Sequence, residues 1–83
     1  MEKRLGFVGI IIENRAQYAA EVNDLLSQFG HIIITRTGVP YEKGACAAIT
    51  LIIDATTDEL GILTGKLGRL TGVSVKSMLS KPT

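Results

Sequence analysis

The side chains best suited to bind a ligand lie in one short polar segment, Asn14-Arg15-Ala16-Gln17. The segment follows an apolar run and precedes a helical pattern, so Asn14 can cap the helix with Gln17 in the capping-box position. Backbone N–H groups at a helix start can hold a carboxylate or another anion, and these side chains add donors. The sequence therefore predicts a small-ligand site at residues 14–17. Ordinary capping with a solvated Arg15 is the alternative.

Residues for catalysis or metal binding are scarce. His31 and Cys46 are the only soft metal ligands, whereas zinc or nickel generally needs three or four. A site shared between subunits would need help from carboxylates such as Glu13 or Asp54. These two acids each end an apolar strand and could lie at the same end of a sheet, where a solvated role is favoured over acid–base catalysis. We therefore expect no enzyme activity, no metal and no cofactor.

A glycine-containing segment, Gly61–Leu67, invites comparison with a phosphate-binding loop. Its first glycine is one residue too close, Leu67 replaces the Ser or Thr that would hold magnesium, and the segment sits inside a helical pattern. Gly61, Gly65 and Gly68 fall near one side of that helix, each at a cost of roughly 1 kcal/mol relative to Ala. Close packing against a neighbour is the expected reason, with a ligand on the glycine face as the alternative.

The elements that position these residues follow from hydrophobic periodicity. Apolar runs over 5–12, 32–37, 45–54 and 73–79 predict strands, and two amphipathic patterns predict helices. The first helix, with a stripe through Val22 and Leu26, should stop at Gly30, and Thr56 with Glu59 should cap the second. The order is βαββαβ, an α+β ferredoxin-like sandwich: a four-stranded antiparallel sheet with both helices on one face. We expect one domain over residues 1–83, with 80–83 a frayed end.

The first and third predicted strands carry apolar residues on both faces. They should lie at the sheet centre, so the face without helices would leave Ile or Val side chains wet unless a partner covers it. The second strand is the expected edge, poorly guarded by its Ile32-Ile33-Ile34 run. The pattern predicts a homodimer or a higher homo-oligomer.

Composition bounds the partners and the compartment. Nine basic and eight acidic side chains leave a net charge of +1 and no basic footprint for nucleic acid. With two Tyr, two Phe and no Trp, the chain also lacks the aromatic platforms of an RNA-binding sheet. One cysteine excludes an internal disulfide, and no segment approaches the length of a membrane span. We expect a cytoplasmic protein with no direct nucleic-acid or membrane partner.

Specific residues resemble known families. Ile11–Arg15, with a helix ending at Leu25–Gly30, is similar to the opening of an ACT domain, the ferredoxin-like amino-acid-sensing module. Three further blocks, Arg4–Gly6, Arg36–Tyr41 and Leu63–Lys76, resemble the small regulators of the iron-only hydrogenase system. That family is similar in fold to ACT domains and to the C-terminal domain of the nickel-responsive repressor. The repressor's several metal-binding histidines have no counterparts here.

The resemblance implies a non-catalytic regulatory module of the hydrogenase system. Our first hypothesis is that a small effector binds at a subunit boundary near residues 14–17. The alternative is a ligand-free docking module for a hydrogenase maturation protein or a transcription partner. The sequence leaves open which ligand binds, whether dimers or tetramers form, and whether His31 and Cys46 join an intersubunit metal site.

Overall fold

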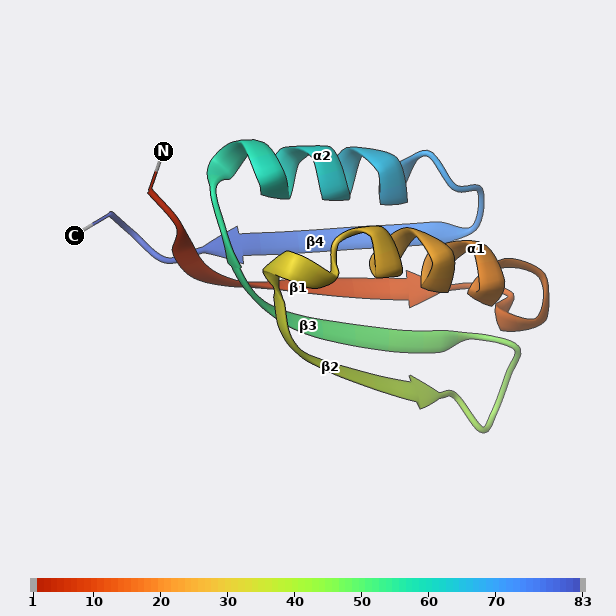
Figure 1. The fold of residues 1–83 in the computed structure, drawn as a ribbon. Helices are drawn as coiled ribbons and strands as arrows, with labels where there is room; N and C mark the ends of the chain where they lie inside the picture. The colour runs from red at the N-terminus through yellow and green to blue at the C-terminus, as the bar shows by residue number, and fades with distance from the viewer. Residues whose placement is uncertain (1, 83) are drawn as a thin grey trace.

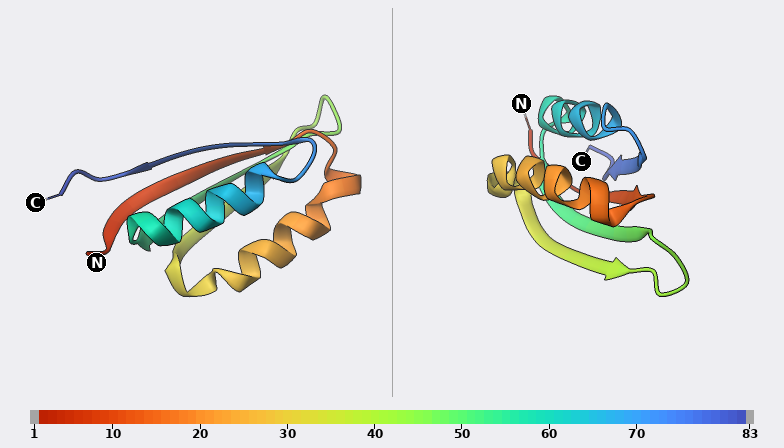
Figure 2. Two further views of the ribbon diagram at one scale, coloured as in Figure 1. Left: turned by 90° about the horizontal axis from the view of Figure 1, so that it is seen from above. Right: turned by 90° about the vertical axis from the view of Figure 1, so that its right-hand side faces the viewer.

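The structure, a computed structural model, describes residues 2–82 and confirms the predicted order of elements (Figure 1). Four strands form one antiparallel sheet in the order β2-β3-β1-β4, so β1 and β3 are central and β2 is an edge, as predicted. The helices α1 and α2 cover one face, and the other face is open (Figure 2). The elements are β1 (Arg4–Ile12), α1 (Arg15–Gln28), β2 (Ile33–Pro40), β3 (Ala47–Ala55), α2 (Thr57–Gly68) and β4 (Val73–Leu79).

Alternation along the central strands decides which side chains are buried. Val8, Ile10 and Ile12 of β1 are at most 1% exposed and pack beneath the helices, together with Leu51 and Ile53 of β3. The helices complete this core through two apolar stripes. The stripe residues that are buried are Val22 and Leu26 of α1 and Leu63 and Leu67 of α2.

The first helix ends beside Gly30, as predicted, but Gly30 does not have the left-handed conformation that is common at this position. Helix α1 ends at Gln28 with Phe29 as its C-cap, and a short 3-10 turn over Gly30–Ile32 leads into β2. Within the described residues only Gly72, after α2, has a positive φ, of 76°. Ile32 is therefore buried in the turn, and β2 begins one residue later and ends three residues later than predicted.

The remaining boundaries agree with the sequence to within two residues. Strand β4 spans the predicted residues, and β3 is shifted by one or two residues at its ends. The predicted frayed end is tied down at its start, because the Ser80 N–H donates to the Leu5 carbonyl at 2.7 Å. Thr83, the last residue of that segment, lies outside the described residues. No helix within 2–82 is long and apolar enough to cross a membrane.

Candidate functional site

The predicted ligand-binding segment forms the start of α1. Asn14 is the N-cap, and its side-chain Oδ1 accepts a hydrogen bond from the backbone N–H of Gln17 at 3.3 Å. The Asn14 carbonyl accepts the N–H groups of Gln17 and Tyr18 at 3.2 and 3.0 Å. Of the expected capping box, the bond to the Asn14 side chain is therefore present. Among the first four amides of α1, only that of Ala16 lacks an acceptor in the described part of the chain.

Arg15 is not a free surface donor. Its Nη1 lies 2.8 Å from the Gly44 carbonyl oxygen and 2.9 Å from that of Cys46, with the Tyr41 carbonyl at 3.5 Å. Its backbone N–H also donates to the Ala45 carbonyl at 2.9 Å. One residue thus ties the start of α1 to the β2–β3 loop, 26 to 31 positions away. This bridge could not be predicted from the residue types, because any residue of the loop can offer a backbone carbonyl.

The other two residues of the segment, Ala16 and Gln17, are exposed. The first turn of α1 contains no acidic residue, so no helix carboxylate neutralises its partial positive charge. The start of α2 differs, because its first turn contains Asp58 and Glu59. The Ala16 N–H and the exposed Gln17 side chain therefore lie at a helix start without a carboxylate, beside an Arg15 guanidinium that contacts the β2–β3 loop.

The open face of the sheet is the second candidate surface. Its side chains alternate with the buried ones along the central strands β1 and β3, and the edge strands β2 and β4 continue it in register across the sheet. Six large apolar side chains on it are between 36% and 59% exposed. They are Leu5, Phe7 and Ile11 of β1, Val39 of β2, Ile52 of β3 and Met78 of β4. The predicted wet apolar face is therefore present in the single chain.

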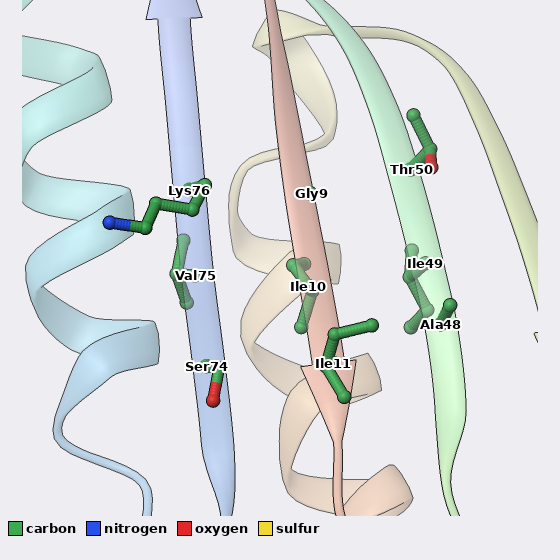
Figure 3. A pocket seen from close by; sticks show the side chains of 9 residues that line it. All are labelled: Gly9, Ile10, Ile11, Ala48, Ile49, Thr50, Ser74, Val75 and Lys76. Atoms are coloured by element: carbon green, nitrogen blue, oxygen red, sulfur yellow. The ribbon is translucent and has the colours of Figure 1, made fainter.

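Two of the hollows on this face lie near the candidate residues; a third, of about 240 Å³, lies between Phe7, Ile52 and Met78. One, of about 260 Å³, lies over Gly9 in the middle of the sheet, with Ala48, Thr50, Ser74 and Lys76 around it (Figure 3). The other hollow, of about 280 Å³, lies where the β2–β3 loop begins. Its lining is almost entirely apolar and consists of Ile11, Val39, Pro40, Tyr41, Cys46, Ala47 and Ala48. The Tyr41 and Cys46 carbonyls are among those that Arg15 contacts, so this hollow adjoins the start of α1.

The expectation that Glu13 and Asp54 share one end of the sheet is wrong. Strands β1 and β3 are antiparallel, with Ile12 opposite Ala47 and Leu5 opposite Asp54, so the two acids lie at opposite ends. His31 and Cys46 are separated in the same way, at opposite ends of β2 and β3. Within residues 2–82, no group of three His, Cys, Asp or Glu side chains is placed to hold a metal ion.

The α2 glycines do not pack against a neighbour within this chain. A Cβ added at Gly61, Gly65 or Gly68 would meet nothing within 4 Å, and all three residues are exposed. Close packing inside the molecule is therefore not their explanation. Lys66 lies on the same helix with its Nζ 5.8 Å from the centre of the Phe29 ring.

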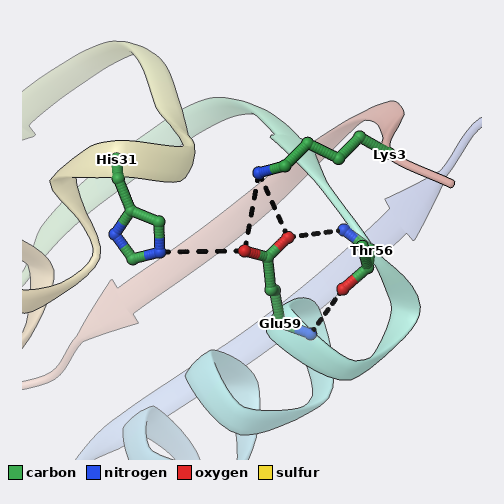
Figure 4. A network of polar contacts seen from close by, with 4 residues as sticks. All are labelled: Lys3, His31, Thr56 and Glu59. Atoms are coloured by element: carbon green, nitrogen blue, oxygen red, sulfur yellow. Dashed lines mark hydrogen bonds and ion pairs between the residues drawn. The ribbon is translucent and has the colours of Figure 1, made fainter. Parts of the chain in front are cut away.

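A polar network joins the start of α2 to residues distant in the sequence (Figure 4). Glu59 and Thr56 form the predicted capping box, with bonds of 2.8 and 3.1 Å. Glu59 also lies 3.3 Å from Lys3 Nζ and 3.7 Å from His31 Nε2. The Thr56 N–H has the largest effect on the pKa of Glu59 and lowers it; partial desolvation opposes this, and Lys3 lowers it further. The Glu59 carboxylate therefore joins the start of α2 to Lys3 and His31, which are distant in the sequence.

Comparison with known proteins places this architecture. A family model described as "TM1266-like: Iron-only hydrogenase system regulator, putative" matches residues 4–77. The solved structure of TM1266 from Thermotoga maritima is similar to this chain, with a TM-score of 0.91 and 38% identity; the match covers 96% of this chain and 100% of that one. None of the curated proteins matches the sequence.

Two other structures share the fold at lower identity. The ACT domain of the GTP pyrophosphokinase from Chlorobium tepidum has a TM-score of 0.78 and 23% identity, over 92% of this chain and 99% of that one. A PII-like nitrogen regulatory protein from Thiomonas intermedia, bound to ADP, AMP and bicarbonate, has a TM-score of 0.50 and 24% identity, over 94% and 91%. These likenesses confirm the ACT-like, ferredoxin-like α+β fold.

Proposed function

This chain belongs to the TM1266-like family of iron-only hydrogenase system regulators, and from that membership we propose that it is a non-catalytic, self-associating module of the cytoplasm that senses a small ligand. The proposed ligand site is the start of α1, at Asn14, Arg15, Ala16 and Gln17. The ligand carries a carboxylate, phosphate or similar anionic group, because the donors gathered there are N–H groups.

One observation carries this proposal: the Arg15 guanidinium joins the start of α1 to the β2–β3 loop through the carbonyls of Gly44 and Cys46. An anion at the Ala16 N–H would compete for the same guanidinium, since a charged acceptor binds it more strongly than a carbonyl does. Ligand binding would then loosen or shift the loop.

The loop lies beside the open face, so a ligand that shifts the loop would also affect the subunit boundary. Tyr41 and Cys46 line the hollow next to Ile11, and their carbonyls are contacted by Arg15. A loop position that favours one arrangement of subunits would couple ligand affinity to association, and the coupling must be reciprocal. The physical link between the two sites is one residue, Arg15, and the part that its side chain contributes can be tested by a single substitution.

Thermal unfolding of the purified protein against amino acids, adenine nucleotides, bicarbonate and divalent metals tests ligand sensing. The nucleotides and bicarbonate are included because the PII-like relative in fold binds them. A ligand at a hundredfold excess over its Kd that binds only the folded state stabilises it by about 2.7 kcal/mol, which is a readily measured shift for a domain of this size. No shift across the panel would contradict ligand sensing.

Arg15→Lys tests the site with little change in charge. Lysine keeps the cation but cannot bridge several acceptors in a fixed plane. We expect the apparent affinity for any active ligand to fall at least tenfold in Arg15→Lys. In Gln17→Ala the apparent affinity should fall by a smaller factor. Arg4→Lys is the matched control, because the Arg4 guanidinium also donates to a backbone carbonyl, that of Ser80, and Arg4 begins β1 at the end opposite to Asn14. Unchanged affinity in Arg15→Lys would remove the site assignment.

The exposed β2 edge favours a second candidate function, a ligand-free docking module. Val39 on this strand is 57% exposed, as is Ile34 beside the irregularity in its pairing with β3. A maturation protein or a DNA-binding regulator of the hydrogenase system could add a strand there. A stable complex with such a purified partner in metabolite-free buffer, together with a silent ligand panel, would favour this function over sensing.

A further inference from the structure

The hollow in the middle of the open face is not required by the fold of the single chain. Gly9 forms its floor, paired with Thr50 on one side and Lys76 on the other. A Cβ added at Gly9 would meet only the Lys76 carbonyl oxygen, at an ordinary contact distance of 3.8 Å. The backbone at Gly9 does not have a positive φ either. A larger residue would fit this strand, so the glycine needs another explanation.

The same strand contains a glycine that the fold does explain. A Cβ at Gly6, on the helix-covered face, would lie 2.5 Å from the Met78 carbonyl oxygen and 2.6 Å from Leu79 Cδ2. Gly6 is therefore fixed by packing within the chain. Glycine in a strand often marks a place where another group approaches closely, and at Gly9 that group is absent from the chain itself.

We propose that a second copy of this chain covers the open face, with Phe7 of each copy seated in the Gly9 hollow of the other. Phe7 stands two residues from Gly9 on the same face and is 44% exposed. A two-fold axis perpendicular to the strands at the level of Val8 places Phe7 over the partner's Gly9 and Leu5 over the partner's Ile11. Projection and hollow lie on one face, as a self-complementary contact requires. This inference rests on the self-association in the proposed function and specifies its geometry.

The chemistry of the open face agrees with a dimer of this kind. Six large apolar side chains on it, contributed by all four strands, are between 36% and 59% exposed. An exposed apolar patch of this kind usually marks an interface, and the same patch on a second copy is its apolar complement.

Charge does not oppose the contact. Lys76 is the cation beside the hollow, and in Figure 3 its side chain extends past the outer edge of β4, away from Gly9. Because β4 is an edge strand, the ammonium group can stay in water while its stem lies over the sheet. Asp54, opposite Leu5, is the other charged side chain that β1, β3 and β4 place on this face, and it lies near the end of β3, away from Gly9.

Substitutions at Gly9 test the interface by sedimentation velocity over a range of protein concentrations. We expect the wild-type chain to shift from monomer to dimer and Gly9→Val to weaken association at least tenfold while remaining folded by circular dichroism. Gly38→Val is the matched control: a Cβ there meets only Ile49 Cγ1, at 3.9 Å, and Gly38 lies on the opposite face of β2. Equal association of Gly9→Val and the wild type would overturn the proposal, as would a wild-type monomer at high micromolar concentration.

Exchanging the two residues sharpens the test. Phe7→Gly and Gly9→Phe should each weaken association, because one removes the projection and the other fills the hollow. The double variant restores a phenylalanine opposite a glycine across the same two-fold axis, so we expect it to dimerise more tightly than either single variant. A double variant no better than the singles would exclude the Phe7–Gly9 contact.

The two experiments distinguish a failure of the proposed interface from a failure of the proposed ligand site. If Gly9→Val weakens association and no ligand of the panel stabilises the protein, the proposed interface is supported and ligand sensing is contradicted. A ligand that stabilises the wild type, combined with unchanged association of Gly9→Val, would leave sensing intact and remove this interface.

Discussion

The two faces of β1 are built from similar residues but have different surroundings. Val8, Ile10 and Ile12 are at most 1% exposed under the helices, whereas Phe7 and Ile11 are 44% and 47% exposed. A strand that needed only one buried face would alternate apolar with polar residues. The apolar residues on the uncovered face therefore favour the proposed contact with a second copy.

The largest contrast should appear between two neighbouring isoleucines. Ile10→Ala removes a fully buried side chain and should cost about 2–5 kcal/mol of unfolding free energy, whereas Ile11→Ala in dilute protein should cost less than about 1 kcal/mol. Urea unfolding of both variants measures the difference. The cost of Ile11→Ala should grow with protein concentration because folding is then coupled to association. Equal costs at low concentration would show that the faces are not distinct in the monomer.

A smaller contrast is expected between the two glycines, because Gly6→Ala and Gly9→Ala should change the unfolding free energy in opposite directions. Gly6→Ala forces a Cβ against the Met78 carbonyl and should destabilise the fold by about 1–3 kcal/mol. Gly9→Ala has room for its methyl group and should stabilise the monomer by roughly 0.5–1 kcal/mol through the lower backbone entropy of the unfolded chain. Thermal unfolding in dilute solution compares the two. A destabilised Gly9→Ala monomer would mean that the chain itself requires this glycine.

The sequence predicted the fold well because its signals are local or periodic. Alternation in β1 and β3 identified the central strands, and Thr56 with Glu59 identified the start of α2. The helix end beside Gly30 was predicted, but not the 3-10 turn over Gly30–Ile32 that follows it without a left-handed residue. The prediction was wrong for Glu13 and Asp54, since strand direction, and not strand order along the chain, decides which ends meet.

The candidate site was less predictable. Asn14 capping follows from residue type, but the Arg15 bridge depends on carbonyls of the β2–β3 loop, which any residue can offer. The Gly9 hollow has a visible signal, a glycine within an apolar strand. Only the structure separates it from Gly6, because the distinction depends on which neighbouring atoms a side chain would meet. The assignment of residues 14–17 to a ligand stays a prediction.

The smallest expected effect is a pH dependence of the unfolding free energy that comes from the helix-covered side. Glu59, on the helix-covered side, has its pKa lowered below the ordinary value of 4.5, chiefly by the Thr56 N–H. A lowered folded-state pKa means that the ionised carboxylate stabilises the fold fully above that ordinary value and that this contribution is lost as the pH falls through the folded-state pKa.

Acidification below about pH 4.5 should therefore reduce the unfolding free energy of the monomeric Gly9→Val variant. The same loss should be smaller when Glu59→Gln is added, since glutamine cannot titrate. Urea unfolding from pH 7 to pH 3 measures both series. Parallel pH dependence of the two variants would show that the ionisation of Glu59 does not contribute to the unfolding free energy.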